Sequence, residues 1–503
     1  MGRLPESAGT APRRCAIAAA MTAAEQTVLE QLAKVLGPRG LTRDDELLAP
    51  WLSDWRRRYH GKALAMASPA STDELAETMR ICAAHGIPVV PQGGNSGMSG
   101  GATPDESGSA LLVSLRRMSA IRRIDPAARI VECEAGVVLQ SLHDAVAPHG
   151  LRFPLTLGGK GSATVGGLIS TNAGGTQVLR HGVMRAQVLG LEAVLADGSI
   201  YSALTPLKKD NRGFDLKQLF IGSEGTLGIV TAATLRLVPA LADRVVIWAG
   251  LPSIHAARAL LLHCQAQAGE ALEGFEVLPR SCLDAVLAHL PQARAPLAGS
   301  HAWNALIEIV AEEGNADGLR GKAESILAGA LEGGLLEDAA ISSSEAQAEA
   351  FWTLRDSISA AQRARGPAVQ HDVSVAVEKM PAFIEAAIAM VERDFPGTHA
   401  FGYGHLGDGN IHFHVGAPAG FLREEWEPTQ GKAISRAVHD LLREWGGSLS
   451  AEHGIGQMKL GEMARTHDPV ALDLLRRVKS ALDPAGLLNP GKLVALAPGE
   501  CSA

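Results

Sequence analysis

Five residues in the last quarter of the chain have side chains that bind divalent metals and move protons. His405, His412 and His414 stand close together, and Glu452 and His453 follow in a second short motif. Two imidazoles and a carboxylate form a mixed nitrogen and oxygen ligand set that leaves a coordination position open, as in catalytic zinc sites. A histidine beside that carboxylate is free to act as a base. Taken alone, each histidine is more often a hydrogen-bonded structural residue, so it is the density of the cluster that indicates a metal site.

Residues 410–415 must position two of these histidines. His412 and His414 alternate there with Ile411, Phe413 and Val415. Alternate residues of a strand share a face, so this pattern predicts a strand with both imidazoles on one face and an apolar core on the other.

Three glycine-rich segments with few charges lie in the first half of the chain, at 91–101, 157–175 and 222–230. Backbone N–H groups that no side chain covers can surround an anionic pyrophosphate. A flexible surface loop is the alternative interpretation, although such loops usually carry more charge. Three such segments in one half of the chain indicate a single large ligand with phosphates and a ring system.

Residues 402–407 (GYGHLG) match the G-x-G-x-x-G pattern of dinucleotide-binding proteins. That fingerprint requires a helix directly after the glycines. The segment leads into the predicted strand 410–415 instead, so a Rossmann site is disfavoured.

Composition excludes several classes of protein. The formal net charge is -8 and aromatic residues are 4% of the chain, which disfavours a nucleic-acid-binding protein. No apolar run reaches the roughly 18 residues of a transmembrane helix. The six cysteines form no C-x-x-C pair, which favours reduced thiols in a cytoplasmic protein. Residues 13–20 faintly resemble a signal peptide, but an unstructured extension or a start at Met21 is the favoured interpretation.

Periodicity predicts alternating helices and strands, with a change of character near residue 240. The chain is therefore expected to be α+β. The predicted helices are 24–36, 72–84, 253–272, 316–333, 378–393 and 465–482. The predicted strands are 87–91, 110–113, 130–133, 188–195, 231–237, 305–310 and 410–415.

Six motifs in this order resemble the FAD-dependent D-2-hydroxyacid dehydrogenases of the vanillyl-alcohol-oxidase-like flavoproteins. That group includes D-2-hydroxyglutarate dehydrogenase, D-lactate dehydrogenase and the glycolate oxidase FAD subunit. The resemblance runs from about residue 45 to 495. The motifs are PQGGNSGMSGG, LGGKGSATVGGLISTNAGG, KDNRGFDL with LFIGSEGTLGIVT, GHLGDGNIHFHV, SAEHGIG and LDPAGLLNPGKL.

The resemblance implies a two-part FAD-binding domain of the PCMH type, an α+β substrate-binding cap domain and a C-terminal helical segment. The expected boundaries are an N-terminal extension and helix at 1–44, the FAD domain at 45–240, the cap at 241–450 and a segment returning to the flavin at 451–503. Covalent members of the superfamily often have a histidine where Asn95 stands, so noncovalent FAD is expected. The implied FAD contacts are Pro91, Gly93, Gly94, Asn95, Ser96, Gly97, Met98, Gly161, Ser162, Gly166, Gly167, Thr171, Asn172, Gly175, Glu224, Gly225, Gly228, Ile229 and Asn489.

The resemblance also assigns the chemistry. It implies that His405, His412 and Glu452 bind one divalent metal, usually zinc, and that His453 is the general base. A D-2-hydroxyacid would lose its hydroxyl proton to His453 and its α-hydrogen to the flavin as hydride, giving the 2-oxo acid. Arg355, in the stretch WTLRDSI, matches the clamp for the substrate carboxylate, and Ser359 matches a small hydroxyl residue nearby.

Two substrate positions depart from the family pattern. Gln370 stands where many relatives have lysine, and His414 stands where hydroxyglutarate-type relatives often have asparagine. A missing cation should weaken binding of a second carboxylate. This disfavours 2-hydroxyglutarate and leaves D-lactate, another monocarboxylate or an unusual hydroxyacid open. A protonated His371 or His414 would restore the charge.

The expected partners are a small 2-hydroxyacid and an electron acceptor, either an electron-transfer flavoprotein or a cytochrome or quinone system. Relatives are often homodimers. One alternative is a redox-neutral flavoenzyme of the same fold, such as an alkyl-glycerone-phosphate-synthase-like transferase, although the consecutive histidines of that group are missing here. The others are a metal-dependent hydrolase without flavin, and a silent FAD subunit of a glycolate-oxidase-like complex.

Overall fold

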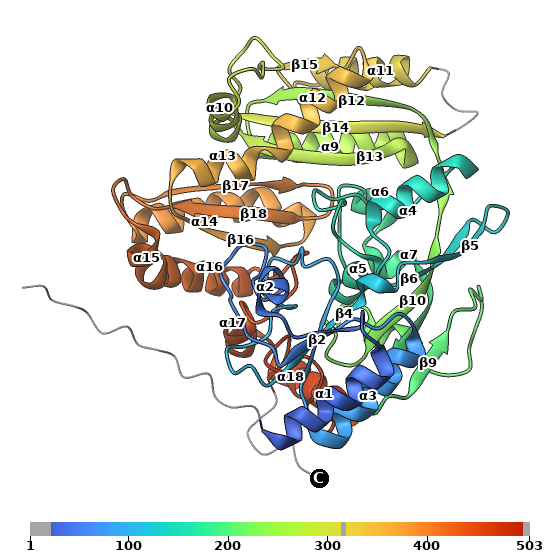
Figure 1. The fold of residues 1–503 in the computed structure, drawn as a ribbon. Coiled ribbons are helices and arrows are strands. Elements are labelled where there is room, and N and C mark those ends of the chain that lie inside the picture. Colours follow the sequence, from blue (N-terminus) through green and yellow to red (C-terminus); the bar gives the residue numbers. More distant parts are fainter. Residues whose placement is uncertain (1–21, 313–317, 496–503) are drawn as a thin grey trace, which may run out of the picture.

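The computed structural model describes residues 22–312 and 318–495, which form two lobes, one above the other in Figure 1. Residues up to about 240 build the lower lobe, and most of the following residues build the upper one. The last helices return to the lower lobe. Met21, the alternative start, lies outside the described residues, as do Cys15 and Cys501.

The lower lobe begins with a small sheet of order β1-β2-β4-β3, in which β2, β4 and β3 run parallel. Its strands are β1 (Leu41–Thr42), β2 (Ala65–Ala67), β3 (Val89–Gln92) and β4 (Leu111–Ser114). Two amphipathic helices, α1 (Ala23–Leu36) and α3 (Thr72–His85), share its core. Ser71 caps the N-terminus of α3, and Gly86 ends it with φ 65°. A short helix, α2 (Asp45–Leu48), precedes β2.

A five-stranded antiparallel sheet of order β5-β6-β10-β8-β9 completes the lower lobe. Its apolar residues join the same core as the first sheet. The strands are β5 (Ile121–Asp125), β6 (Ile130–Glu134), β8 (Val188–Val194), β9 (Ile200–Ala203) and β10 (Ile229–Arg236), with β7 (Leu151–Arg152) and β11 (Val238–Pro239) paired separately. The helices are α4 (Leu139–Val146), α5 (Val165–Thr171), α6 (Val178–His181), α7 (Met184–Gln187) and α8 (Lys217–Phe220).

The upper lobe is a seven-stranded antiparallel sheet of order β15-β12-β14-β13-β17-β18-β16 between two layers of helices (Figure 1). The strands are β12 (Leu241–Leu251), β13 (Leu272–Pro279), β14 (Trp303–Glu312), β15 (Asp338–Ile341), β16 (Ala368–Ser374), β17 (His399–His405) and β18 (Asn410–Gly416). One face packs on α9 (Ile254–Ala268), α11 (Leu319–Glu332), α14 (Met380–Asp394) and α16 (Lys432–Glu444). The other packs on α10 (Arg280–His289), α12 (Glu345–Asp356) and α13 (Ile358–Arg365).

The strand β18 carries the two chemically interesting histidines as predicted. Ile411, Phe413 and Val415 are fully buried in the core on the α14 side of the sheet. His412 and His414 lie on the opposite face, where both border a cavity. The predicted division of this strand into a core face and a chemical face is confirmed.

The C-terminal segment joins the two lobes. After α15 (Arg423–Trp426) and α16, the chain forms α17 (Leu460–Thr466) and α18 (Pro469–Leu482). It then pairs with β3 of the lower lobe, where the Val89 N–H donates to the Leu487 carbonyl at 2.8 Å and the Asn489 N–H donates to the Val89 carbonyl at 2.7 Å. The last motif of the sequence therefore belongs to the wall of the lower lobe.

Most predicted elements are present, with shifted ends. The predicted helix 253–272 ends at Ala268, because Leu272 already begins the buried strand β13. The predicted helix 465–482 is two helices, since Asp468 caps a new one that starts with Pro469. The GYGHLG segment lies in β17 and the following turn, not before a helix.

The cysteines and the helix lengths can also be compared with the sequence predictions. The four described cysteines, Cys82, Cys133, Cys264 and Cys282, are buried free thiols as expected. Among residues 22–312 and 318–495 there is no helix with the length and apolar character needed to cross a lipid bilayer.

Candidate functional site

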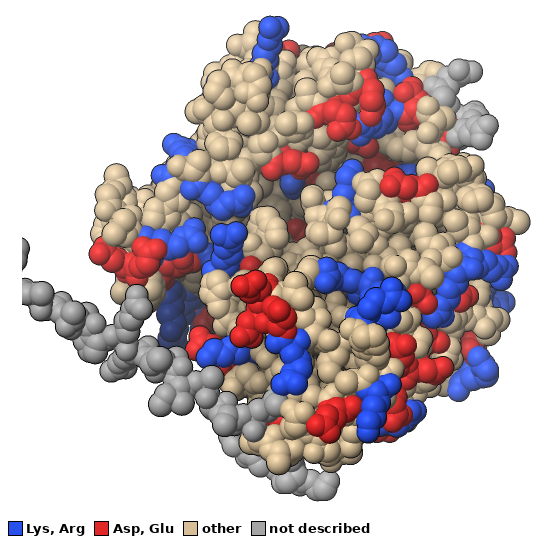
Figure 2. All heavy atoms as spheres, in the orientation of Figure 1, with Lys and Arg blue, Asp and Glu red and all other residues tan. Residues whose placement is uncertain are grey.

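A cavity of about 700 Å³ lies where the two lobes meet. Its lower wall is made by the three glycine-rich segments, and its upper wall by α12, α13, β16, β17 and β18. Figure 2 shows this face of the molecule hollowed between the lobes, with Lys and Arg side chains around the opening. Its volume lies within the range of small-molecule and cofactor sites.

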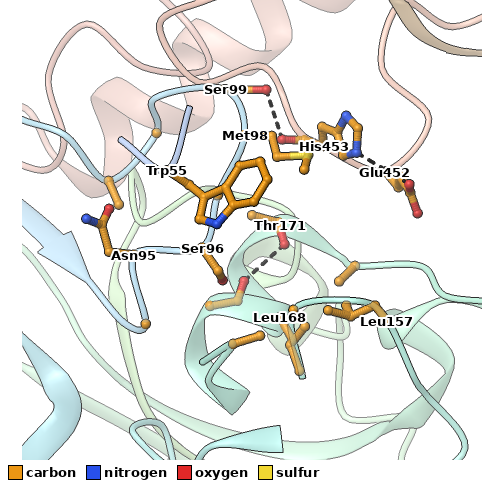
Figure 3. A pocket seen from close by; sticks show the side chains of 18 of the residues that line it. Trp55, Asn95, Ser96, Met98, Ser99, Leu157, Leu168, Thr171, Glu452 and His453 are labelled. Carbon is orange, nitrogen blue, oxygen red and sulfur yellow. Dashed lines mark hydrogen bonds and ion pairs between the residues drawn. The ribbon is translucent and has the colours of Figure 1, made fainter. Parts of the chain in front are cut away.

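The lower wall fits a large ligand with phosphates and a ring. Gly97, Gly158 and Gly161 line the cavity, and each has open space where a Cβ would stand. Side chains there would occupy the cavity, so these glycines leave backbone next to the ligand space. In Figure 3, Trp55, Met98 and other side chains surround the same space. This wall therefore suits the FAD that the sequence predicts.

Most of the predicted cofactor residues line the cavity. These are Pro91, Gly93, Gly94, Asn95, Ser96, Gly97, Met98, Gly161, Ser162, Gly166, Gly167, Thr171, Glu224, Gly225 and Ile229. The Asn95 amide points away, donating to the Ser53 carbonyl at 2.9 Å, while Ser96 lies at the cavity wall (Figure 3). Asn95 also adopts φ 53°, a left-handed conformation that asparagine tolerates.

Four predicted cofactor residues do not line the cavity, and they contact the segments behind its wall instead. Asn172 ends α5 with φ 50°, and its side chain accepts from the Arg185 N–H at 2.9 Å. A Cβ on Gly175 would meet the Thr156 carbonyl, and one on Gly228 would meet the Phe220 ring. The Asn489 amide donates to the Gly101 and Glu224 carbonyls at 2.9 and 2.7 Å. The two glycines therefore leave room for close neighbours, and the two asparagines bond backbone groups.

Glu224 connects the third glycine-rich segment to the motif that carries His453. Its carboxylate accepts the N–H groups of Ile455 and Gly456, each at 2.7 Å. Burial raises the pKa of Glu224, and these two hydrogen bonds oppose that effect. The side chain therefore fixes the position of the 452–456 loop against the lower lobe.

The three predicted metal ligands come together. One ligand atom from each of His405, His412 and Glu452 lies within 4.8 Å of the other two. Burial lowers the pKa of His412 to about 4, so its ring is neutral at neutral pH. Burial raises the pKa of Glu452, but a hydrogen bond and charge from His453 outweigh it and give a pKa of about 2. A neutral imidazole and an ionised carboxylate are the forms that bind a divalent metal.

The buried carboxylate of Glu276, on β13, orients His405 and was not found from the sequence. It accepts from His405 Nδ1 at 2.5 Å, and Nε2 of the same ring stands 3.2 Å from an Arg355 nitrogen. Burial lowers the pKa of His405, but the charge and hydrogen bond of Glu276 outweigh it and give a pKa of about 9, so this ring must release a proton to bind a metal. Burial raises the pKa of Glu276, but Arg355 and His405 outweigh it and give a pKa of about 2. Glutamate inside an otherwise apolar strand was the available signal, because a buried carboxylate requires partners.

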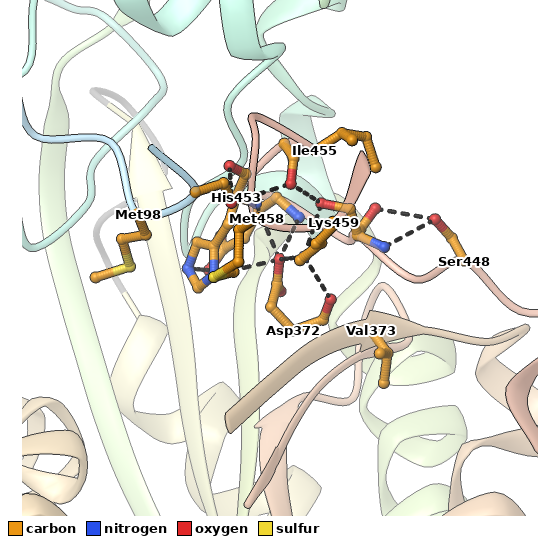
Figure 4. A network of polar contacts seen from close by, with 12 residues as sticks. Met98, Asp372, Val373, Ser448, His453, Ile455, Met458 and Lys459 are labelled. Carbon is orange, nitrogen blue, oxygen red and sulfur yellow. Dashed lines mark hydrogen bonds and ion pairs between the residues drawn. The ribbon is translucent and has the colours of Figure 1, made fainter. Parts of the chain in front are cut away.

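His453 is oriented by Asp372, which lies on β16 (Figure 4). His453 Nδ1 is 3.3 Å from Asp372 Oδ2, and its Nε2 is 3.4 Å from Glu452 Oε1. Burial raises the pKa of Asp372, but the charges of His453 and Lys459 outweigh it and hold the pKa far below its usual range. Asp372 also accepts the backbone N–H groups of Glu452 and His453 at 3.1 and 2.9 Å. Sequence reasoning missed this role because 80 residues separate the partners.

Arg355 lies at the cavity but is already paired. Its guanidinium forms a 2.8 Å ion pair with Glu276 and approaches His405 Nε2 at 3.2 Å. Its side chain is 13% exposed. The guanidinium also lies 3.5 Å from the exposed carboxylate of Asp356, and it stands beside the predicted metal ligands. Ser359, one turn along, also lines the cavity.

Family comparisons agree with this geometry. A model described as "FAD binding domain" matches residues 63–203, and one described as "FAD linked oxidases, C-terminal domain" matches residues 241–493. The mitochondrial D-2-hydroxyglutarate dehydrogenases of Arabidopsis thaliana and Bos taurus are each 36% identical to the chain. They cover 92% and 93% of it, and the chain covers 80% and 83% of them. The chain belongs to the D-2-hydroxyglutarate dehydrogenase family of FAD-linked oxidoreductases.

Another relative in this family is the D-2-hydroxyglutarate dehydrogenase of Xanthomonas citri pv. viticola. It is 36% identical, covering 88% of this chain and 91% of its own. Among solved structures, p-cresol methylhydroxylase superposes with a TM-score of 0.73 at 16% identity, covering 95% of this chain and 98% of its own. Alkyldihydroxyacetonephosphate synthase superposes with a TM-score of 0.69 at 15% identity, covering 92% and 84%. The predicted PCMH-type fold is confirmed.

The surroundings of His371 and His414 bear on the substrate charge in this family member. Either ring, if protonated, would supply a cation in place of the lysine missing at Gln370. Burial lowers the pKa of His371 to about 3, and burial also lowers the pKa of His414 far below its usual range. The imidazole rings of His371 and His414 are therefore both neutral. His371 also contacts the Phe413 carbonyl and Ser435 Oγ rather than open space, at 3.1 and 3.0 Å.

Proposed function

We propose that this flavoenzyme oxidises a D-2-hydroxyacid of the 2-hydroxyglutarate or lactate class to the 2-oxo acid, with noncovalent FAD and one divalent metal, zinc. One observation carries the proposal. The His405, His412 and Glu452 cluster and the oriented His453 border the same cavity as the glycine-rich wall. The names of the 36% identical relatives support the substrate class.

The residues divide the work as follows. A bound FAD would supply the acceptor for the hydride of the α-carbon, and a bound divalent metal would supply the Lewis acid for the substrate hydroxyl and carboxylate. His405, with Nδ1 held by Glu276, offers Nε2 to the metal together with His412 and Glu452. Arg355 lies beside them to bind the carboxylate next to the reacting carbon.

His453 takes the hydroxyl proton at Nε2. Asp372 lies at the opposite nitrogen, so a proton on Nδ1 is held there and Nε2 is the nitrogen that faces the cluster. As that imidazole becomes cationic, the ionised Asp372 stabilises it. The electrons that leave the α-carbon require an external acceptor, and we propose an electron-transfer flavoprotein or a cytochrome or quinone system.

One experiment tests this function. The purified holoprotein is mixed without oxygen with D-2-hydroxyglutarate, its L-enantiomer or D-lactate, and the visible absorbance of the flavin is followed. We expect a D-acid to bleach the flavin, the L-acid to leave it oxidised, and prior removal of metal by chelation to prevent bleaching while FAD stays bound. A flavin that no D-2-hydroxyacid reduces contradicts the proposed oxidation, and bleaching that survives chelation contradicts the metal role.

A further inference from the structure

Two arginines at the cavity have no carboxylate partner. Arg355 is neutralised by Glu276, but Arg56 and Arg363 form no ion pair within 4.0 Å among residues 22–312 and 318–495. Both line the same cavity as Gln370 and His414. A guanidinium facing a ligand cavity without a counter-ion is suited to an anionic group of the ligand.

Arg56 is presented to the cavity by a tight turn. The buried carboxylate of Asp54 accepts the Arg56 N–H at 3.2 Å and the Arg58 and Tyr59 N–H groups at 2.6 and 2.7 Å. The Arg56 guanidinium donates to Met98 Sδ at 3.5 Å. Burial and the charge of Arg58 lower the pKa of Arg56 to about 10, and Asp372 opposes them only in part. Arg56 remains a cation with little compensating charge.

Arg363 comes from the opposite wall. It lies one turn after Ser359 on α13 and donates to Ser359 Oγ at 2.8 Å, and its guanidinium stands 5.9 Å from the centre of the Trp55 ring. Trp55 immediately precedes Arg56, so the two arginines approach each other from separate lobes. The positive charges of Arg56 and Arg363 both act to lower the pKa values of Tyr403 and His414, so both arginines lie near these two side chains. His414 is paired with Gln370 across β16 and β18.

We infer that Arg56 and Arg363 bind a second carboxylate of the substrate, at the end of the carbon chain remote from the hydroxyl. This inference rests on the proposed function and narrows its substrate class to D-2-hydroxy diacids. Both guanidiniums line the cavity that Gln370 also lines, so they supply the charge that glutamine lacks and that neutral His371 and His414 do not provide. A monocarboxylic acid would leave both cations facing an uncharged tail.

The test compares two substrates of equal carbon number, D-2-hydroxyglutarate and D-2-hydroxypentanoate, which lacks the distal carboxylate. We expect Arg56→Gln and Arg363→Gln each to lower kcat/KM for the diacid about 10- to 100-fold, because a hydrogen bond to a charged group is lost. The kcat/KM for D-2-hydroxypentanoate should change less than about threefold in the same variants, because its tail carries no charge. Arg57→Gln is the matched control, because Arg57 is exposed and does not line the cavity.

Binding without turnover separates this inference from the proposed function. The affinities of the oxidised holoprotein for 2-oxoglutarate and 2-oxopentanoate are measured by calorimetry in the same variants. Selective weakening of 2-oxoglutarate supports the subsite even if no hydroxyacid reduces the flavin, a result that would contradict only the oxidation. Equal losses for both oxo acids, or no loss for either, overturn the second-carboxylate site.

Discussion

At the scale of single residues, the site depends on two carboxylates that touch neither cofactor nor substrate in the proposed reaction. Asp372 holds His453 from behind, and Glu276 holds His405. Each is buried and ionised, and each is surrounded by donors that keep its pKa low. An imidazole on a flexible loop would sample several orientations, so these partners set which ring nitrogen faces the cavity.

Replacing Asp372 with asparagine should lower kcat by roughly 100-fold, because His453 loses the charge that stabilises its protonated form. FAD and metal contents should stay unchanged. Steady-state kinetics, with flavin absorbance and metal analysis of the same preparation, check this. A loss of FAD in proportion to the loss of activity would show instead that Asp372 acts by supporting the fold.

Replacing Glu276 with glutamine should lower the affinity for Zn²⁺ by about 10- to 100-fold, because His405 loses its anionic hydrogen-bond acceptor. Competition against a chromogenic chelator measures this affinity without turnover. Glu308→Gln is the control, since Glu308 is a buried glutamate of the neighbouring strand β14 that accepts from Trp352. Equal Zn²⁺ affinity in the two variants would contradict a role for Glu276 in metal binding.

At the scale of elements, the sequence was most informative where polar and apolar residues alternate or where glycines gather. The two faces of β18 followed from this alternation alone. By contrast, residues 245–251 of β12 are buried on both faces, and such a continuous apolar run does not separate a strand from a helix. The types of ligand in the site were predictable, but the carboxylates that orient them were not. Glu276 meets His405 only because β13 pairs with β17, and Asp372 meets His453 only because the 452–456 loop folds back against β16.

The end of α18 has a structural role within the C-terminal motif. Lys479 Nζ donates to the Thr226 and Leu488 carbonyls at 2.7 and 2.8 Å and pairs with Asp483, and both side chains are nearly inaccessible. The Asp483 carboxylate accepts the N–H groups of Leu487 and Leu488 at 3.0 and 2.8 Å. These contacts attach the last motif to the third glycine-rich segment.

Replacing Lys479 with methionine should destabilise the protein by about 3 to 5 kcal/mol, because Asp483 is left as a buried unpaired charge. Arg477→Met, one half-turn away, should cost less than about 1 kcal/mol, since its pair with Asp473 is exposed. Thermal unfolding of both holoproteins measures the difference. If the two variants unfold at the same temperature, the buried pair does not stabilise this end of the chain.

At the scale of the whole molecule, a buried ion cluster joins the lobes. Glu273, on β13 of the upper lobe, pairs with Arg152 and Arg180 of the lower lobe, and Arg180 also bonds Glu312 at 2.8 Å. The Glu273 side chain is 3% exposed. Burial raises the pKa of Glu273, but hydrogen bonds from His181 and Arg152 outweigh it and give a pKa of about 2.

The depressed pKa of Glu273 predicts acid sensitivity of the contact between the lobes. The stabilisation is complete above the ordinary value of 4.5 and is lost as the pH falls toward 2. At about 1.4 kcal/mol per pH unit it amounts to roughly 3 kcal/mol. The unfolding temperature of the wild type should therefore fall more steeply over this range than that of Glu273→Gln. Glu385→Gln, at an exposed pair, should keep the wild-type slope. Parallel curves for Glu273→Gln and wild type would contradict this.

The position of the glycine-walled cavity between the lobes has a physiological consequence. A cofactor bound there contacts both halves, so its binding free energy adds to the stability of both, by about 1.4 kcal/mol for each tenfold excess of free FAD over its dissociation constant. Proteases in a cell remove chains in proportion to the time they spend open. We therefore expect the amount of this enzyme in a cell, and not only its turnover rate, to follow the supply of riboflavin.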